Sequence, residues 1–164
     1  AIALNANPKL KSSRAKQGDV LVYKDYCHIG LAVDTPNGLV VPVIRDADKK
    51  SIWTLSDEIR ELAAKAKDKK LKPDEMQGAV FTVSSLGNIG GHGFTPIVNT
   101  PEVGILGVSK ASTQPVWDGS AFQPRTMLPV SLSYDHRVVN GGDAGRFLTY
   151  LVALLSDIRQ LVMN

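Results

Sequence analysis

The sequence predicts one α/β or α+β domain of two layers, in which helices cover a mixed β-sheet. Its 164 residues suit a single compact domain. A hydrophobic fraction of 43% with 21% charged residues is typical of a globular protein rather than a disordered one. Strand-like and helix-like patterns follow each other in the order strands, helix, strands, helix. That order favours a sheet packed against helices.

Residues 19–44 carry three strand patterns separated by Gly and Pro. The segments are VLVY, CHIGLAVD and GLVVPVI, all rich in β-branched and aliphatic residues. From residue 52 to residue 66 apolar residues recur at helical spacing, with charged residues between them. We expect a helix there, capped by Ser51 or Thr54 and stopped near Pro73.

The second half of the sequence predicts further strands and a last helix. AVFTVSS and VGILGVS have strand patterns, and WDGSAF is typical of a hairpin turn between QPVW and the strand segment FQPRTMLPVSLSY. The loop 86–102 between the first two is rich in Gly and Pro, and a loop of this length is usually functional or part of an interface. Residues 144–162 predict one long helix with a wide apolar face.

Composition and charge exclude several functions. The formal charge is +3, the pI is near 9.0 and no long run of like charge occurs, so we expect no nucleic-acid binding. The longest apolar run is broken by Ser156, Asp157 and Arg159, which excludes a membrane span there. A single cysteine, Cys27, excludes an internal disulfide and suits a reducing compartment. We expect the cytoplasm, with an organelle matrix as the alternative.

His136 is the candidate catalytic base. It lies in SLSYDHRVVNGG, between a predicted strand and the first turn of the last helix, which Asn140 or Asp143 could cap. The positive end of that helix would favour a neutral imidazole, as a general base requires. The alternative interpretation is that His136 fills space at the strand end and hydrogen-bonds locally.

The segment DHRVVNG resembles the DHRxxDG signature of the acyltransferase component of 2-oxo acid dehydrogenase complexes, which is related to the HxxxDG motif of chloramphenicol acetyltransferase. Further blocks resemble this family in its order and spacing: HIGLAVDTPNGLVVPVIRDADKKS, FTVSSLGNIGG, FTPIVNTPEVGILGVSK, PVWDG, PRTMLPVSLSYDHR and LSDIRQLVM. The resemblance runs from about Asn5 to the C-terminus. The chain is identified as a member of this family, most similar to its bacterial, pyruvate-linked, acetyl-transferring members.

The resemblance implies a chloramphenicol acetyltransferase-like fold and an acetyl transfer between a dihydrolipoyl thiol and coenzyme A. It gives His136 the role of the base that deprotonates a thiol, and Ser84 that of the donor to the tetrahedral oxyanion. Ser85 would point to the opposite face of its strand and is not expected to take part. The mechanism needs no covalent enzyme intermediate, so we expect Cys27 to be a buried structural residue. The lipoyl group would be carried by a domain outside this chain.

Asn140 stands where most members of the family have Asp. An Asn cannot form an ion pair with an arginine, so the role of Arg137 stays open, and we expect Asn140 to orient the loop of the base. The shared block around Asp34 suggests that this residue is a wall of the substrate channel. His28 and His92 have no acid or cysteine at ligand spacing, and we therefore expect no metal site.

The resemblance also implies homotrimers whose active sites lie between neighbours, with His136 of one chain meeting Ser84 of the next. Eight trimers would form a cubic 24-mer core that works with a lipoyl domain, a pyruvate decarboxylating component and dihydrolipoamide dehydrogenase. Catalytic domains of this family begin further upstream. We therefore expect residues 1–164 to be a single acyltransferase domain truncated at its N-terminus, without the lipoyl and peripheral-subunit-binding domains.

Two other functions fit parts of the sequence. A small-molecule O-acetyltransferase could use the same fold as a plain trimer, although LSDIRQLVM and PEVGILGVSK argue against it. A scaffold core without activity is the second alternative, supported by Asn140 and by the expected truncation at the N-terminus. No pocket residue identified from the sequence determines which acyl group is preferred.

Overall fold

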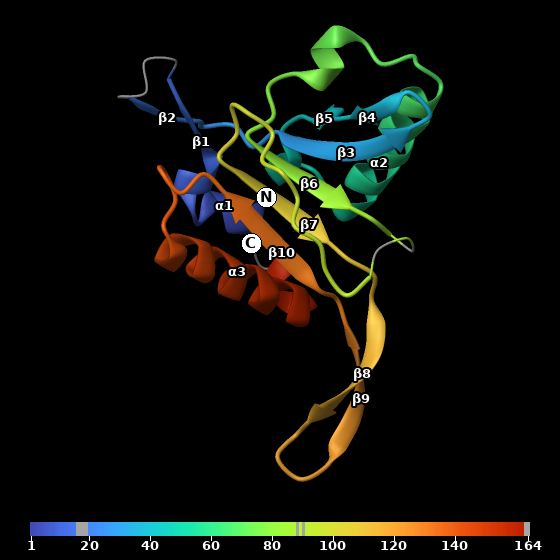
Figure 1. The fold of residues 1–164 in the computed structure, drawn as a ribbon, viewed down its shortest axis with the longest axis vertical. Helices are drawn as coiled ribbons and strands as arrows, with labels where there is room; N and C mark the ends of the chain where they lie inside the picture. Colours follow the sequence, from blue (N-terminus) through green and yellow to red (C-terminus); the bar gives the residue numbers. More distant parts are fainter. Residues whose placement is uncertain (16–19, 88, 90, 163–164) are drawn as a thin grey trace.

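A six-stranded mixed sheet forms the centre of the computed structural model, which describes residues 1–15, 20–87, 89 and 91–162 (Figure 1). Its strands are β3 (Ile29–Thr35), β4 (Gly38–Val40), β5 (Val43–Ile44), β6 (Phe81–Ser85), β7 (Gly104–Val108) and β10 (Val130–Tyr134). Strand β6 runs parallel to β3 and β7, while β4, β5 and β10 pair antiparallel with their neighbours. The predicted mixed sheet is therefore confirmed.

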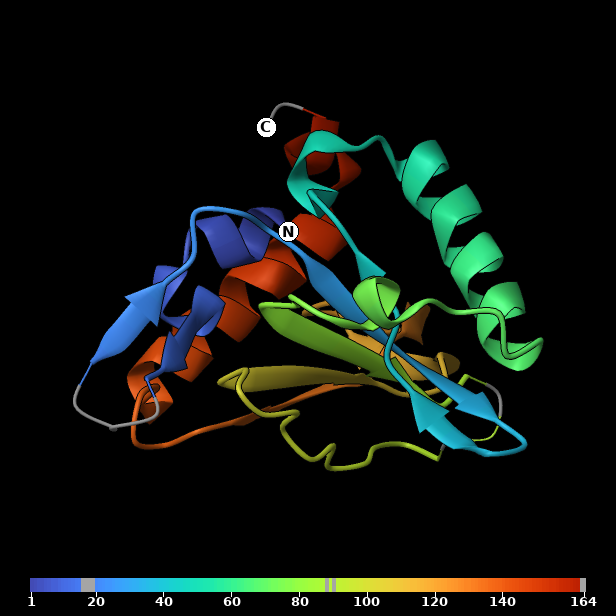
Figure 2. The same cartoon turned by 90° about the horizontal axis from the view of Figure 1, so that it is seen from above.

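The helices lie on one face of this sheet. They are α1 (Ile2–Asn5), α2 (Ile52–Lys67), α3 (Gly141–Ser156) and α4 (Ile158–Val162). In Figure 2 they lie above the sheet, whereas the segment 91–101 runs along its other side. Phe81 of β6 meets Phe147 of α3 in the main core, with ring centroids 5.7 Å apart. Among the described residues, no helix is long and apolar enough to cross a membrane.

Two small sheets and three short 3₁₀ helices complete the described part of the fold. Strands β1 (Ser12–Arg14) and β2 (Leu21–Tyr23) pair beside the 3₁₀ helix η1 (Pro8–Lys11), and the others are η2 (Ala47–Lys49) and η3 (Pro73–Met76). Strands β8 (Ser112–Trp117) and β9 (Phe122–Met127) form a hairpin that projects from the body (Figure 1). The Asp118 carboxylate closes its turn by accepting hydrogen bonds from the Ser120 and Ala121 amides. The predicted hairpin at WDGSAF is thus confirmed.

Some predicted element bounds are wrong. GLVVPVI forms two strands because Pro42 has no N–H to donate to the ladder, although its carbonyl still accepts from the Leu31 amide. The strand in CHIGLAVD begins only at Ile29, and the strand in VLVY begins at Leu21, one residue later than predicted. Asp19, where the predicted strand region begins, lies outside the described residues. The single helix expected over 144–162 is two helices. Asp157 separates them because its carboxylate caps α4 by accepting from the Arg159 amide.

The helix α2 begins as predicted, since the Ser51 hydroxyl accepts from the Thr54 amide at 3.1 Å. It ends at Lys67, well before Pro73, and the prediction that the proline stops it is wrong. Lys69 has a left-handed backbone, with φ of 59°, and its amide bonds to the Ala66 carbonyl. The next amide, of Lys70, bonds to the Lys65 carbonyl, which completes a Schellman motif.

Lys69→Gly is expected to stabilise the protein by about 0.5–1 kcal/mol, because the left-handed conformation strains any side chain but suits glycine. Lys69 is exposed, so little packing is lost. Chemical denaturation measures the change. The matched control is Ala64→Gly on the exposed side of α2, which should lower the free energy of unfolding by about 1 kcal/mol. A Lys69→Gly protein as unstable as the control would contradict the interpretation.

Candidate active site

His136 lies in a tight turn between β10 and α3. The Val138 and Val139 amides both donate to the Asp135 carbonyl, which closes the turn around the histidine. The Asp135 amide donates to the Val103 carbonyl and so ties the turn to the start of β7. His136 is exposed, its ring lies 5.5 Å from that of Tyr134, and its side chain has no hydrogen bond to any described residue. Its nitrogens are therefore free to meet a substrate.

Arg137 pairs with Asp135 of the same turn. Its Nε and guanidinium Nη2 donate to the carboxylate at 2.9 and 2.6 Å, and its amide donates to the same group at 3.0 Å. These bonds lower the pKa of Asp135 to about 2, so the carboxylate stays ionised across the neutral range. The structure gives Arg137 the partner that the sequence left open. The sequence signal for it is Asp135 itself, two residues before the arginine.

Asn140 caps the helix that follows. Its side-chain oxygen accepts from the Asp143 amide at 2.8 Å, and the Asp143 carboxylate faces the Asn140 amide in return. This capping box fixes the first turn of α3. Lys9 and Arg146 both donate to Asp143, at 2.8 and 2.6 Å, which lowers the pKa of that carboxyl. Asn140 therefore holds the end of the His136 loop through hydrogen bonds and without a charge of its own.

Ser84 lies near the end of β6, on the sheet face opposite the helices. Phe81 and Val83 of the same strand belong to the core against α3, and strand alternation turns Thr82 and Ser84 the other way. The Ser84 hydroxyl has no hydrogen bond to a described residue. Ser85 points to the other face and its hydroxyl accepts from the Gly87 amide. Ser85, and not Ser84, thus forms a hydrogen bond with the local backbone. The Ser84 hydroxyl stays available to donate to a substrate.

Asp34 lies beside Ser84. In the parallel pair of β3 and β6, Ala32 is the register partner of Ser84, and Asp34 follows two residues later on the same face. Asp34 is exposed and pairs with Leu39 across the hairpin of β3 and β4. The fold therefore brings together two of the predicted site residues, Ser84 and Asp34.

Within one chain, Ser84 and His136 are far apart. Ser84 is in register with Gly107, and Gly107 with Ser131, two strands away and about 10 Å across the sheet. From Ser131 the strand β10 runs a further stretch of about 10 Å to Tyr134 before the turn of His136 begins. A general base acts at about 3 Å from the proton it takes. One chain thus presents a serine at one end of the sheet and a histidine at the other.

The other residues considered from the sequence have structural surroundings. His28 Nδ1 accepts from the Asp46 amide at 3.0 Å and its ring contacts that of Tyr26 at a tilt of 37°, while burial lowers its pKa. Cys27 is fully buried, which raises the pKa of its thiol. His92 is exposed in the loop after β6. In the described ranges, no three His, Cys, Asp or Glu side chains gather as a metal site would require.

Comparison with known proteins shows close relatives. The chain is 65% identical over 156 residues to the dihydrolipoyllysine-residue acetyltransferase component of the pyruvate dehydrogenase complex of Pseudomonas aeruginosa. It is 63% identical over 163 residues to the same component from Azotobacter vinelandii. These matches cover 95% and 99% of this chain but only 28% and 26% of the relatives. The chain therefore corresponds to about a quarter of their length.

Solved structures share the fold. The A. vinelandii dihydrolipoamide acetyltransferase, in which the catalytic roles of a serine, a histidine and an asparagine were investigated, has a TM-score of 0.94 at 63% identity. The cubic core of a pyruvate dehydrogenase multienzyme complex gives 0.94 at 64% identity. Each match covers 97% of this chain and 65% of the other. Chloramphenicol acetyltransferase, with a TM-score of 0.58 at 16% identity, shares the fold alone.

The family model for the catalytic domain of 2-oxoacid dehydrogenases acyltransferases matches residues 1–163, almost the whole chain. Together with relatives well above half identity, this match shows that the chain belongs to the 2-oxoacid dehydrogenase acyltransferase family.

Proposed function

We propose that this chain transfers an acetyl group between a dihydrolipoyl thiol and coenzyme A, as the catalytic core of a pyruvate dehydrogenase complex. The observation that carries the proposal is the match to the A. vinelandii acetyltransferase, whose investigated serine, histidine and asparagine have the same intervals along the chain as Ser84, His136 and Asn140. The bacterial relatives with the same component name support the acetyl group as the one transferred.

The proposed reaction uses two side chains. His136 takes the proton from the attacking thiol, and the thiolate adds to the thioester carbonyl. The Ser84 hydroxyl donates a hydrogen bond to the oxyanion of the tetrahedral intermediate. When the intermediate collapses, the C–S bond of the original thioester breaks and the protonated His136 returns its proton to the leaving thiolate. The new thioester and a free thiol are the products, with no covalent enzyme intermediate.

The neighbouring groups would hold the base in place. The bidentate pair of Asp135 and Arg137 and the Asn140 cap fix the turn from both sides of His136. A fixed turn reduces the conformational freedom that the imidazole must lose on the way to the transition state. Asn140 acts here as a positioning residue, and Asp34, beside Ser84, as a wall of the substrate path.

We further propose that each active site is shared by two chains, with Ser84 from one and His136 from its neighbour. Support comes from the distance between the two residues in one chain, which rules out their acting together there. A head-to-tail contact that closes on itself gives a cyclic assembly, for which we propose a trimer. The match to a cubic core supports eight such trimers, assembled with lipoyl domains, the pyruvate decarboxylating component and dihydrolipoamide dehydrogenase.

Residues 1–164 are proposed to act as a single acyltransferase domain in the bacterial cytoplasm. The bacterial relatives and the one buried, unpaired cysteine suit a reducing compartment. Acetyl-CoA and the dihydrolipoyl group are substrates in this proposal, and no step requires a metal.

His136→Ala should lower the rate of acetyl exchange by about 10²–10⁴, because the general base is lost. The measurement is transfer from acetyl-CoA to dihydrolipoamide by parent and variant in parallel. An active parent with an equally active variant would remove His136 from the mechanism. A parent without activity would instead support the scaffold function.

Ser84→Ala should reduce kcat by about 10²–10³ with little change in KM, because the oxyanion loses its donor only in the transition state. Ser85→Ala is the matched control, since the adjacent hydroxyl faces the other way and is expected to keep the parent kcat. The assignment fails when the two variants behave alike.

A mixture of the two inactive variants tests the shared site. Chains with Ser84→Ala keep His136, and chains with His136→Ala keep Ser84, so joint assembly after co-expression restores an intact pair at some interfaces. Random assembly in equal amounts should restore about a quarter of the sites and of the parent activity. Mixed assemblies as inactive as the separate variants would contradict a site between chains.

A further inference from the structure

The segment Phe94–Glu102, here called the strap, crosses the sheet face that carries Ser84. Figure 2 shows this part of the chain on the side of the sheet away from the helices. The strap has no regular secondary structure, so side-chain contacts to the sheet must fix its position. It is attached to the sheet by hydrogen bonds near both of its ends.

At its first end the strap lies next to Ser84. The Ser131 hydroxyl donates to the Phe94 carbonyl at 2.6 Å. A Cβ atom added to Gly107 would lie 3.1 Å from both the Phe94 ring and Pro96, so the strap packs directly on this glycine. Gly107 is also the register partner of Ser84. The strap therefore forms a wall beside the Ser84 hydroxyl.

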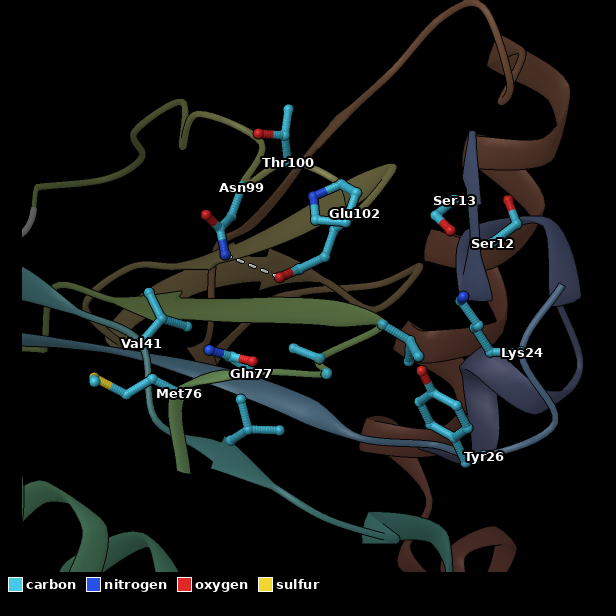
Figure 3. Close-up of a pocket in the computed structure, with 15 residues that line it drawn as sticks. Ser12, Ser13, Lys24, Tyr26, Val41, Met76, Gln77, Asn99, Thr100 and Glu102 are labelled. Atoms are coloured by element: carbon cyan, nitrogen blue, oxygen red, sulfur yellow. Dashed lines mark hydrogen bonds between the residues drawn. The ribbon is translucent and has the colours of Figure 1, made fainter. Parts of the chain in front are cut away.

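At its other end the strap is held by a buried carboxyl group. Glu102 is only 6% exposed, and its Oε2 accepts from the Thr82 hydroxyl at 2.6 Å. Its Oε1 accepts from Asn99 Nδ2 at 3.0 Å, as Figure 3 shows. Thr82 precedes Ser84 by two residues on β6 and faces the same side. The carboxyl group thus joins the strap to the strand of the catalytic serine.

The Thr82 hydroxyl is itself closely confined. A Cβ atom on Gly30 of the neighbouring strand would lie 2.6 Å from Thr82 Oγ1 and 2.9 Å from Val41. Only a glycine at that position leaves the hydroxyl where it meets Glu102. The backbone of Glu102 also forms a bridge to Ser13 of β1, which ties this end of the strap to a second sheet.

The Glu102 carboxyl group is buried beside open space and not within dense apolar packing. Glu102 lines a cavity of about 500 Å³ together with Gln77, Lys24 and Tyr26, so space remains beside it (Figure 3). Burial raises the pKa of Glu102, and none of the described basic side chains forms an ion pair with it. A buried carboxyl group without an ion pair is costly to fold, and this cost favours a specific role for Glu102.

We propose that Glu102 is a positioning residue for the acyl-transfer site: through Thr82 and Asn99 it holds the strap against β6, and the strap forms the wall along which the substrate lies beside Ser84. This inference rests on the proposed acetyl transfer. A wall contacts the substrate equally before and during the reaction, so loosening it weakens binding and leaves the chemical step almost unchanged. Loss of the oxyanion donor has the opposite signature, a fall in kcat.

The experiment compares Glu102→Ala, Glu102→Gln, Thr82→Val and Thr82→Ser in the assembled protein, with KM and kcat for acetyl-CoA and dihydrolipoamide. Glu102→Ala and Thr82→Val should each raise the KM of at least one substrate about tenfold while kcat stays within about threefold of the parent. Glu102→Gln and Thr82→Ser should restore a KM near that of the parent, because an amide and a serine hydroxyl can still form the hydrogen bond. The double variant with Glu102→Ala and Thr82→Val should have a KM no higher than that of either single variant, because both changes break the same hydrogen bond.

Gln77→Ala is the matched control, since Gln77 lines the same cavity without a hydrogen bond to the strap among the described residues. It should keep the parent KM, and an equal rise in KM would assign the effect to the cavity and overturn the proposal. Variants with a lower melting temperature but unchanged KM would show a purely structural role for Glu102.

An inactive parent would reject the proposed acetyl transfer itself, and this result is distinct from unchanged KM and kcat in active variants. Thr82→Val and Thr82→Ser keep the test decisive when Glu102→Ala fails to assemble.

Discussion

The register of three adjacent strands, β6, β7 and β10, is the constraint on which the candidate site depends. Ser84, Gly107 and Ser131 lie in one cross-strand row, and every other position follows from it. A slip of one residue in β6 would turn Ser84 into the helix-covered core and Thr82 away from Glu102. Packing of Phe81 and Val83 against α3 resists that slip, so the same apolar contacts that stabilise the fold also orient the serine.

The two ends of the sheet hold their candidate catalytic side chains in different ways. At the His136 end an exposed histidine lies in a short turn, which the buried Val139 anchors in the core and which hydrogen bonds among Asp135, Arg137 and the backbone also hold. At the Ser84 end the side chain extends from a regular strand, which needs no such support. The region around Glu102 combines both ways, because buried polar contacts tie an irregular segment to a regular strand there.

Asn140 contributes to the site through hydrogen-bond geometry rather than charge. Asn140 supplies a cap that an aspartate could supply equally well, since the bond it makes is to the Asp143 amide. Arg137 finds its anionic partner in its own turn, so the absence of a negative charge at position 140 does not leave the guanidinium unpaired. The fixed conformation of the loop therefore survives the departure from the usual DHRxxDG pattern.

The sequence by itself determined the fold class, the hairpin at WDGSAF and the start of α2, because strand alternation, helical spacing and capping residues act locally. It determined the family through the resemblance of DHRVVNG and six further blocks. It also indicated Ser84 through the family resemblance, and strand alternation then placed Ser85 on the opposite face. Only the tertiary structure decided that Arg137 pairs with Asp135 and that Asp34 lies beside Ser84. It also gave the distance within one chain between Ser84 and His136, which the resemblance had placed in an active site between neighbouring chains. The ends of α2 and α3 and the buried contacts of Glu102 were also known only from the tertiary structure. Each depends on register, on backbone conformation at single residues such as Lys69, or on contacts between segments distant in sequence, none of which a local pattern specifies.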